Sequence, residues 1–507
     1  MPKQRTYLNI LCSVVTMAVN LAVSFRLSPY IIRTIGVEAN GYVGLANSFV
    51  TWANLLVTAL NAMASRFITI AWIRQDRKKA NLYYNSVFWG NLLIASVLVL
   101  PAALLVGNLE RVIAVPGELL PDVKLLFSLV FGLFFLRTAV PSWECATSIT
   151  NRLELVYLPE MGAALLRCGL LVGIFRLWTP RVWYISLVSV LTGLLTMGIA
   201  ARNCRRLTPG LRVRFRKPLC SRASIRELVG SGIWSAVASG GNMLLTGLDL
   251  LVCNLYLGPT AMGVLSISKT LPAILTQVSD SIRGAFGPEL TICYARGDRA
   301  GLYACLKRAM KITSLAVTLP AAGLVVMSDA FYALWVPAQD ARLLQILTAL
   351  AVLSYLVNSG VVVLFNVFSL VNRVKYNAAA MLTSGFFSLA VTVVLIRFTD
   401  WDLYAVAGVS SIVIIGKNLL FTVPVASRLL GYRWSTFYPQ VGVSLLCSAV
   451  VLGIGMLVRS LLSVDTWTWT WFFVSCGLTG LLSLGANLCI VLNRQERRYL
   501  LHFFRKR

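Results

Sequence analysis

Apolar segments of about 20 residues or more recur along the whole chain, and short charged loops separate them. A helix of that length crosses the hydrocarbon core of a bilayer. We therefore predict fourteen membrane-spanning helices, at residues 7–33, 41–65, 82–106, 123–146, 155–178, 182–201, 228–257, 261–291, 302–327, 342–369, 376–397, 403–427, 438–461 and 469–492.

The second predicted helix carries a regular polar stripe within its apolar sequence. Polar residues stand there at spacings of three and four, which places them on one helix face: Asn47, Thr51, Asn54, Thr58, Asn61 and Ser65. The first predicted helix has a similar stripe of Asn9, Ser13, Thr16, Asn20 and Ser24. Something other than lipid is expected against both faces.

The chain repeats itself at an offset of about 222 residues. At this offset IGVEANGYVGLANSF, from Ile35, meets LGPTAMGVLSISKTL, from Leu257, and Gly36 and Gly41 coincide with Gly258 and Gly263. In the same way, IRQDR meets ARGDR, AVP meets WVP, and TNRLEL meets VNRVKY. Each repeat holds six predicted helices in the same orientation, which is the parallel-repeat plan of alternating-access transporters.

The expected fold is therefore an all-α polytopic membrane protein with two parallel six-helix lobes around a central cavity, plus a C-terminal helix pair. The predicted divisions are an N-terminal lobe at residues 1–202, a basic linker at 203–227, a C-terminal lobe at 228–430, and the added helix pair with a basic tail at 431–507.

Polar faces recur in the second repeat with charged residues. An offset of 222 takes Asn47 to Lys269, Thr58 to Asp280 and Asn61 to Arg283. The seventh predicted helix has its own stripe of Ser231, Ser235, Ser239, Asn242, Thr246 and Asp249. Two alternatives remain open, because such residues either line a cavity or join neighbouring helices through hydrogen bonds.

A charged side chain inside a membrane span costs free energy on insertion, so it usually faces a cavity or a partner. The substrate-binding candidates, polar and charged, are Arg26, Asn47, Asn54, Asn61, Arg137, Asn242, Lys269 and Arg283. Lys269 either binds an anionic phosphate or pairs with Asp249. Asp280 either pairs with Arg283 or binds a coupling proton or sodium ion, and Asp249 is a second candidate for that ion.

Composition narrows the class further. The chain is 58% hydrophobic and 13% charged, with a mean hydropathy of +0.76, which leaves no interval for a sizeable soluble domain. Its net charge of +27 gathers in alternate loops and in the tail, so the positive-inside rule predicts that both termini are cytoplasmic. Anionic lipids, rather than nucleic acid, are the expected partners of these cations.

Histidine and cysteine usage argues against catalysis. The single histidine, His502, lies in the basic tail, and the eleven cysteines include no CxxC pair. We therefore expect no metal site, no histidine-based catalytic arrangement and no cofactor beyond a coupling H⁺ or Na⁺. The protein is expected not to be an enzyme.

The motifs resemble those of the Wzx-like polysaccharide flippases within the multidrug/oligosaccharidyl-lipid/polysaccharide exporter superfamily. IGVEANGYVGL and LGPTAMGVLSI are similar to the family's L-G-x-x-x-x-G-x-x element, and PELTICYARGDRAGLYACLKRAMKI is similar to its P-x-L-S…G-D element. The resemblance implies transport of an undecaprenyl-diphosphate-linked oligosaccharide across the bacterial inner membrane. It also implies a role in the synthesis of O-antigen, capsule or exopolysaccharide, with a polysaccharide polymerase and chain-length machinery as partners.

Two other functions are compatible with a polytopic fold. A cation-coupled drug antiporter of the same superfamily typically has twelve spans and an acidic site, whereas this chain has two additional predicted helices and no acid in the first two. A membrane-embedded glycan polymerase usually needs a large external loop, and the longest external loop predicted here, near Asn108 to Asp122, is short.

Overall fold

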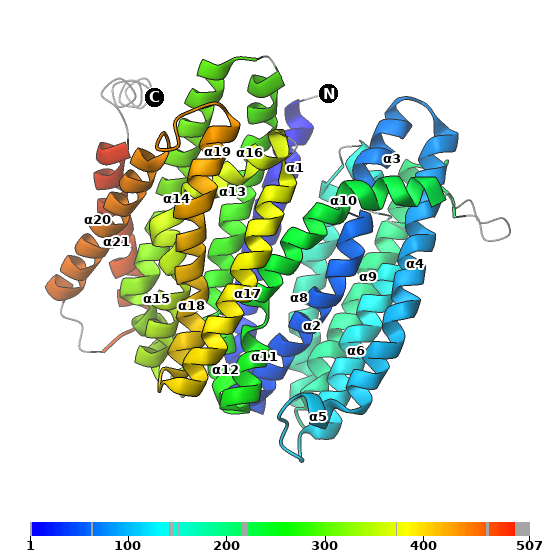
Figure 1. Cartoon of the computed structure of the whole chain (residues 1–507). Coiled ribbons are helices and arrows are strands. Elements are labelled where there is room, and N and C mark those ends of the chain that lie inside the picture. Colours follow the sequence, from blue (N-terminus) through cyan, green and yellow to red (C-terminus); the bar gives the residue numbers. More distant parts are fainter. Residues whose placement is uncertain are drawn as a thin grey trace. The chain divides into compact units, whose positions relative to one another are not determined.

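A computed structural model describes residues 3–61, 64–140, 143, 145–150, 152–213, 222–295, 297–371, 373–462 and 466–491. Over these residues the chain is a series of helices with short connections and contains no strand (Figure 1). Residues 214–221 of the predicted linker and the predicted basic tail from Arg494 lie outside the described part. The all-α prediction is confirmed.

The described chain divides into two compact units. The first comprises Met1–Gly240 with Gly258–Gly263, and the second comprises Gly241–Leu257 with Val264–Arg507. This division does not test the domain boundaries predicted from the sequence, which stay a prediction. The first unit contains α1 (Lys3–Ile35), α2 (Val37–Asn61), α3 (Ala64–Ile73), α4 (Arg77–Gly107), α5 (Leu109–Val112), α6 (Leu120–Ala139), α7 (Cys145–Thr150), α8 (Glu154–Leu177), α9 (Trp183–Leu207) and most of α10 (Arg222–Asn242).

The second unit begins with a π-helix and contains two further irregular turns. Its elements are η1 (Met243–Gly247, π), α11 (Asp249–Leu257), the end of α12 (Pro259–Ser268), α13 (Thr270–Ala295), α14 (Arg299–Trp335), α15 (Ala341–Asn358), η2 (Val361–Leu364, 3₁₀), α16 (Phe365–Leu370), α17 (Val374–Phe398), α18 (Asp402–Lys417), η3 (Asn418–Thr422, π), α19 (Val423–Leu429), α20 (Tyr438–Leu462) and α21 (Trp469–Val491).

Each of the fourteen predicted spans coincides with one or more of these helices. Within the described residues, eleven helical spans are long and apolar enough to cross a membrane, or twelve when the bent pair α12–α13 counts as one span. The remaining two predicted positions correspond to α2 and α6. The protein is thus an all-α polytopic membrane protein, and the count of fourteen stays a prediction.

The sequence repeat is confirmed in the backbone of the helix starts. Gly36 and Gly258 both precede a helix with φ of +91°, a left-handed conformation that glycine adopts without steric cost. Gln75 and Gly297, again 222 residues apart, have φ of +61° and +69°. Corresponding turns therefore share the same unusual conformation.

The next residue of each turn caps a long helix. Asp76 accepts a hydrogen bond from the Lys79 backbone N–H at 2.9 Å and begins α4, and Asp298 accepts one from the Gly301 N–H at 2.8 Å and begins α14. Each carboxylate satisfies an amide that the first helical turn leaves unpaired. The GD-like turns IRQDR and ARGDR are thus helix N-caps.

Repeat-related residues also touch each other inside the first unit. Thr260 Oγ1 donates to Glu38 Oε1 at 2.7 Å, and these residues are 222 positions apart. A Cβ built on Gly263 would lie 2.7 Å from the Val37 carbonyl oxygen, so only glycine allows the starts of α2 and α12 to approach this closely.

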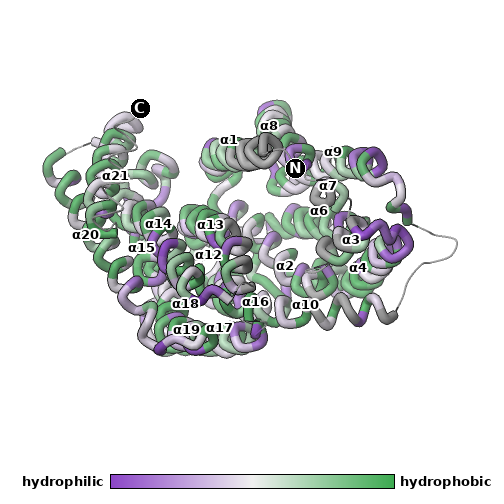
Figure 2. Tube along the Cα trace, turned by 90° about the horizontal axis from the view of Figure 1, so that it is seen from above, coloured by the Kyte–Doolittle hydropathy of each residue, from purple (hydrophilic) through white to green (hydrophobic). Residues whose placement is uncertain are grey.

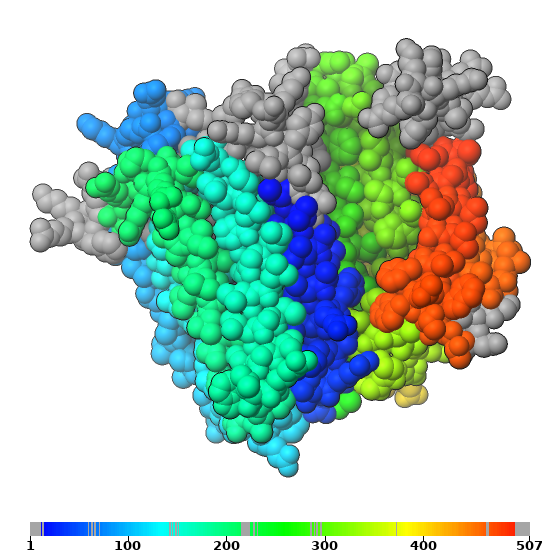
Figure 3. Space-filling view, turned by 180° about the vertical axis from the view of Figure 1, so that it is seen from behind, coloured from blue at the N-terminus to red at the C-terminus, as the bar shows by residue number. Residues whose placement is uncertain are grey.

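Hydrophobic residues predominate in the helices, and Figure 2 shows much of the chain in green in the view from above. The turn between α3 and α4 is hydrophilic and holds four exposed cations, namely Arg74, Arg77, Lys78 and Lys79. Within the first unit α1 packs against α8, and α8 packs against α9 (Figure 3). Within the second unit α14 packs against α15, α20 and α21.

Candidate substrate-binding cavity

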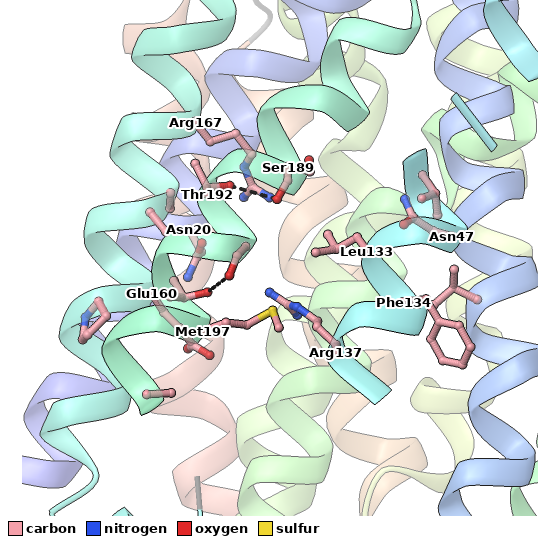
Figure 4. A pocket seen from close by; sticks show the side chains of 18 of the residues that line it. Asn20, Asn47, Leu133, Phe134, Arg137, Glu160, Arg167, Ser189, Thr192 and Met197 are labelled. Carbon is pink, nitrogen blue, oxygen red and sulfur yellow. Dashed lines mark hydrogen bonds between the residues drawn. The ribbon is translucent and has the colours of Figure 1, made fainter. Parts of the chain in front are cut away.

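A cavity of about 930 Å³ lies within the first unit. Residues of α1, α2, α4, α6, α7, α8 and α9 line it, so one helical bundle supplies its walls (Figure 4). Its volume is near the upper end of the range for small-molecule sites. Its polar lining includes six asparagines, which are Asn20, Asn47, Asn54, Asn61, Asn91 and Asn203, and eight serines and threonines.

The polar face of α2 supplies one wall of this cavity. Asn47, Asn54 and Asn61 all line it, as their sevenfold spacing on a single helix face requires. The side-chain amides of Asn47 and Asn61 also donate hydrogen bonds to backbone carbonyls one turn earlier on α2, at 2.9 and 3.2 Å. These bonds fix the orientation of both amide groups. Thr51 and Thr58 do not line the cavity; they bond to the carbonyls of Asn47 and Asn54.

Asn61 has a second partner that the sequence did not indicate. Its side chain and that of Asn91 on α4 exchange two hydrogen bonds, of 3.0 and 3.1 Å. Asn91 is only 4% exposed. Asn61 therefore joins α2 to α4 as well as lining the cavity.

Arg137, in the last turn of α6, enters the cavity opposite α8 and α9. Its guanidinium and the Met197 thioether of α9 point toward one another in Figure 4. Gly193 of α9 lies close to Leu133 of α6, because a Cβ there would lie 2.8 Å from the Leu133 side chain.

Two further charged residues enter from α8. Glu160 and Arg167 line the cavity two helical turns apart, and Arg167 lies beside Ser189 and Thr192 of α9 (Figure 4). Neither was among the predicted site residues. Only packing reveals that they share a cavity with Arg137, because no sequence periodicity connects α6 with α8.

Arg26 is placed elsewhere. It is an exposed residue of α1 and does not line the cavity, whereas Asn20, Ser24 and Ser28 of the same helix do. This follows from helix geometry, because Arg26 lies about 160° around the helix from Ser24 and about 120° from Asn20. A substrate role for Arg26 stays a prediction.

Lys269 and Asp249 pair inside the second unit. Lys269 is the residue between α12 and α13, where the two helices bend by 41°, and its ammonium forms a salt bridge with Asp249 at the start of α11. It also donates to the Thr246 carbonyl of the π-helix η1 at 3.1 Å. One ammonium therefore ties the bend of one span to the irregular turn of another.

The second acidic candidate is paired as well. Arg283 and Asp280, one helical turn apart on α13, form a salt bridge of 3.0 Å. Asn242, the last residue of α10, is exposed, and its carbonyl accepts a hydrogen bond from Thr246 at 3.3 Å. Both carboxylates proposed for ion coupling thus already have a cationic partner within the chain.

No group of three or more histidine, cysteine, aspartate or glutamate side chains suited to a metal ion occurs among the described residues. The central cavity predicted between the lobes and the roles predicted for its residues stay predictions. What the structure assembles is the neutral face of α2 with Arg137, Glu160 and Arg167 in one cavity of the first unit.

Comparison with known proteins decides the family. The sequence model of the polysaccharide biosynthesis protein family matches residues 9–288, more than half of the chain. The chain belongs to this family. It is 27% identical over 501 residues to the uncharacterized membrane protein EpsK of Bacillus subtilis (strain 168), with 98% of each protein covered.

Solved structures show the same fold. The lipid II flippase MurJ, in an inward closed conformation, superposes with a TM-score of 0.65 at 16% identity, over 95% of this chain and 98% of that one. A MOP-superfamily transporter from Pyrococcus furiosus Vc1 superposes with a TM-score of 0.59 at 14% identity, over 83% and 96%. An outward-facing multidrug resistance MATE transporter gives 0.58 at 13% identity, over 88% and 95%. The family model connects the chain with polysaccharide biosynthesis, and the solved structures show that the chain shares their fold.

Proposed function

We propose that the protein is a flippase that moves an undecaprenyl-diphosphate-linked oligosaccharide across the bacterial inner membrane by alternating access. The observation that carries this proposal is the cavity of the first unit, where asparagine, serine and threonine side chains surround two arginines. Amides and hydroxyls both donate and accept hydrogen bonds, which suits the hydroxyl groups of a glycan. The family supports a role in cell-surface polysaccharide biosynthesis, namely O-antigen, capsule or exopolysaccharide.

The two arginines suit the diphosphate of such a substrate. A guanidinium offers several N–H donors in a fixed plane and binds phosphate oxygens in pairs. Arg137 and Arg167 enter the cavity from different helices, α6 and α8, so two phosphates can each meet one arginine. The polyprenyl chain needs no polar partner and stays in the bilayer, where its hydrocarbon is already solvated.

The orientation and the surroundings of the protein form part of the proposal. The cations of the α3–α4 turn and of the end of α9 lie in the cytoplasm, as do both termini, because cytoplasmic loops of membrane proteins are enriched in lysine and arginine. A polysaccharide polymerase and its chain-length machinery receive the substrate on the outer face. A proton or sodium gradient supplies the driving force, and no other cofactor is required.

A cation-coupled drug antiporter of the same superfamily is the second candidate. One observation favours it, namely that the carboxylate of Glu160 lines the cavity, since an acidic cavity suits cationic drugs. The two arginines in the same cavity oppose it, because they leave the lining with net positive charge. Uptake or efflux of a fluorescent cationic dye that depends on the protein and on Glu160 would favour the antiporter.

Depletion of the protein followed by analysis of lipid-linked saccharides tests the proposal. We expect the completed lipid-linked oligosaccharide to accumulate in the cytoplasmic leaflet, while earlier intermediates are made normally. A polymerase defect would instead leave single repeat units on the outer face. Unchanged amounts and sidedness of every lipid-linked saccharide would refute flipping.

A further inference from the structure

The charge of the cavity limits which glycans it accepts. Among the described lining residues the charged side chains are Arg137, Arg167 and Glu160, so two arginines against one glutamate leave a single net positive charge. Every other polar lining group is an amide, a hydroxyl or an indole. Such a lining recognises hydroxyl groups well and provides little compensation for additional negative charge.

The diphosphate linkage already requires the available positive charge. Each of its two phosphates carries one negative charge at neutral pH, which matches the two guanidinium groups. A uronic acid, phosphate or sulfate on the glycan would then lie in the same cavity as the Glu160 carboxylate, without a further cation among the lining residues. Like charges in a partly desolvated space repel by an amount that decides specificity.

In the described part of the second unit, the two cations on the polar face of α12 and α13 already have acidic partners. Lys269 is paired with Asp249, and Arg283 is paired with Asp280. The buried Lys417 lies 3.1 Å from the Met381 sulfur and 4.7 Å from the centre of the Phe365 ring, enclosed among α16, α17 and α18. Two of these cations are paired with carboxylates and the third is buried, which leaves the charge balance of the cavity in the first unit as the basis for selection.

We infer that the transported glycan is uncharged, built from neutral sugar units without acidic substituents. This inference rests on the proposed function, since it assigns the charge class of the same substrate at the same cavity. The neutral hydrogen-bonding groups hold the sugars, the two arginines hold the diphosphate, and Glu160 acts as the specificity-determining residue that rejects acidic sugars while accepting hydrogen bonds from neutral ones.

Two probes of equal length test the inference. They are a neutral N-acetylglucosamine pentasaccharide and a galacturonate pentasaccharide, each joined through diphosphate to a farnesyl chain. Binding is measured on the purified full chain in lipid nanodiscs at about 0.1 M salt, where charges within about 10 Å of one another are incompletely screened. We expect the neutral probe to bind at least tenfold more tightly than the acidic one.

Substitution of the carboxylate sharpens the test. Glu160→Gln keeps the size and an acceptor oxygen but removes the charge, so the preference for the neutral probe over the acidic one should fall roughly tenfold. Glu118→Gln, at an exposed loop acid outside the cavity, is the matched control and should change neither affinity.

The possible failures are distinguishable. Equal or tighter binding of the acidic probe, or an unchanged preference in Glu160→Gln, would overturn the inference about charge while leaving a glycan-binding cavity intact. Failure of both probes to bind to folded protein would overturn the proposed function, and with it this inference.

Discussion

Replacement of Lys269 separates two roles that the sequence leaves open, a substrate contact and an internal ion pair. The side chains of Lys269 and Asp249 are 27% and 13% exposed, so their salt bridge is mostly withdrawn from solvent. Lys269→Ala leaves the Asp249 carboxylate without its ammonium partner. Breaking one side of a buried pair costs about 3–5 kcal/mol, and the partial exposure of Lys269 places the expected loss near about 3 kcal/mol.

The double variant Lys269→Met/Asp249→Asn removes both charges and keeps similar side-chain volumes. It should be destabilised by less than about 1.5 kcal/mol, because volume-conserving replacement of a buried pair is well tolerated. Equilibrium unfolding in mixed micelles, with increasing sodium dodecyl sulfate, gives the free energies of the single and double variants. Lys78→Ala, which removes an exposed cation, is the control and should stay within about 0.5 kcal/mol of the parent.

The comparison also has a clear failure. If Lys269→Ala unfolds like the parent and yet abolishes transport, then Lys269 acts on the substrate and the ion-pair account is wrong. If the double variant is as unstable as the single one, the loss comes from packing at the bend rather than from a stranded carboxylate.

Three further changes test other parts of the structure. Asn61→Leu should lower the free energy of unfolding by about 1–3 kcal/mol, because it leaves the buried amide of Asn91 without its partner. The additional change Asn91→Leu should recover part of that loss in the same unfolding assay. Full stability of the single variant would show that the amide pair is unimportant. Gly263→Ala should cost about 1–3 kcal/mol, because its Cβ would lie 2.7 Å from the Val37 carbonyl oxygen, whereas Gly442→Ala, with open space around the added carbon, should not destabilise. Arg137→Ala should lower the rate of lipid-linked oligosaccharide transport at least tenfold at normal protein level. Arg137→Lys should retain part of the rate, since lysine keeps the charge but not the planar donors. Equal rates for the parent and both variants would exclude Arg137 from the site.

Much of the fold follows from the sequence because membrane helices obey simple rules. Their lengths are set by the bilayer, and the repeat is visible because glycine and aspartate are needed at the same turns, as at Gly36 with Gly258 and Asp76 with Asp298. The polar face of α2 was predictable for the same reason. A regular α-helix brings Asn47, Asn54 and Asn61 to one side whatever packs against it.

Partners on other helices were harder to predict, because they depend on which helices pack together. Asn91 lies six residues beyond Asn85 on α4, and Arg167 lies seven beyond Glu160 on α8, so neither belongs to a polar stripe as continuous as that of α2. Local irregularity adds to this difficulty. The π-helix at Met243–Gly247 adds residues to a turn, so a stripe counted at α-helical spacing from Ser235 to Asp249 cannot keep to one face.

Movement of the substrate by the purified protein tests the central claim most directly. The full chain is reconstituted into liposomes containing an undecaprenyl-diphosphate-linked oligosaccharide labelled on its sugar, and a membrane-impermeant reagent that destroys the label is added outside. Without protein, about half of the label should remain protected in the inner leaflet; with the protein, the account predicts that the protected fraction falls toward zero, and more slowly with Arg137→Ala. A protected fraction that stays near one half with folded, correctly inserted protein would contradict it.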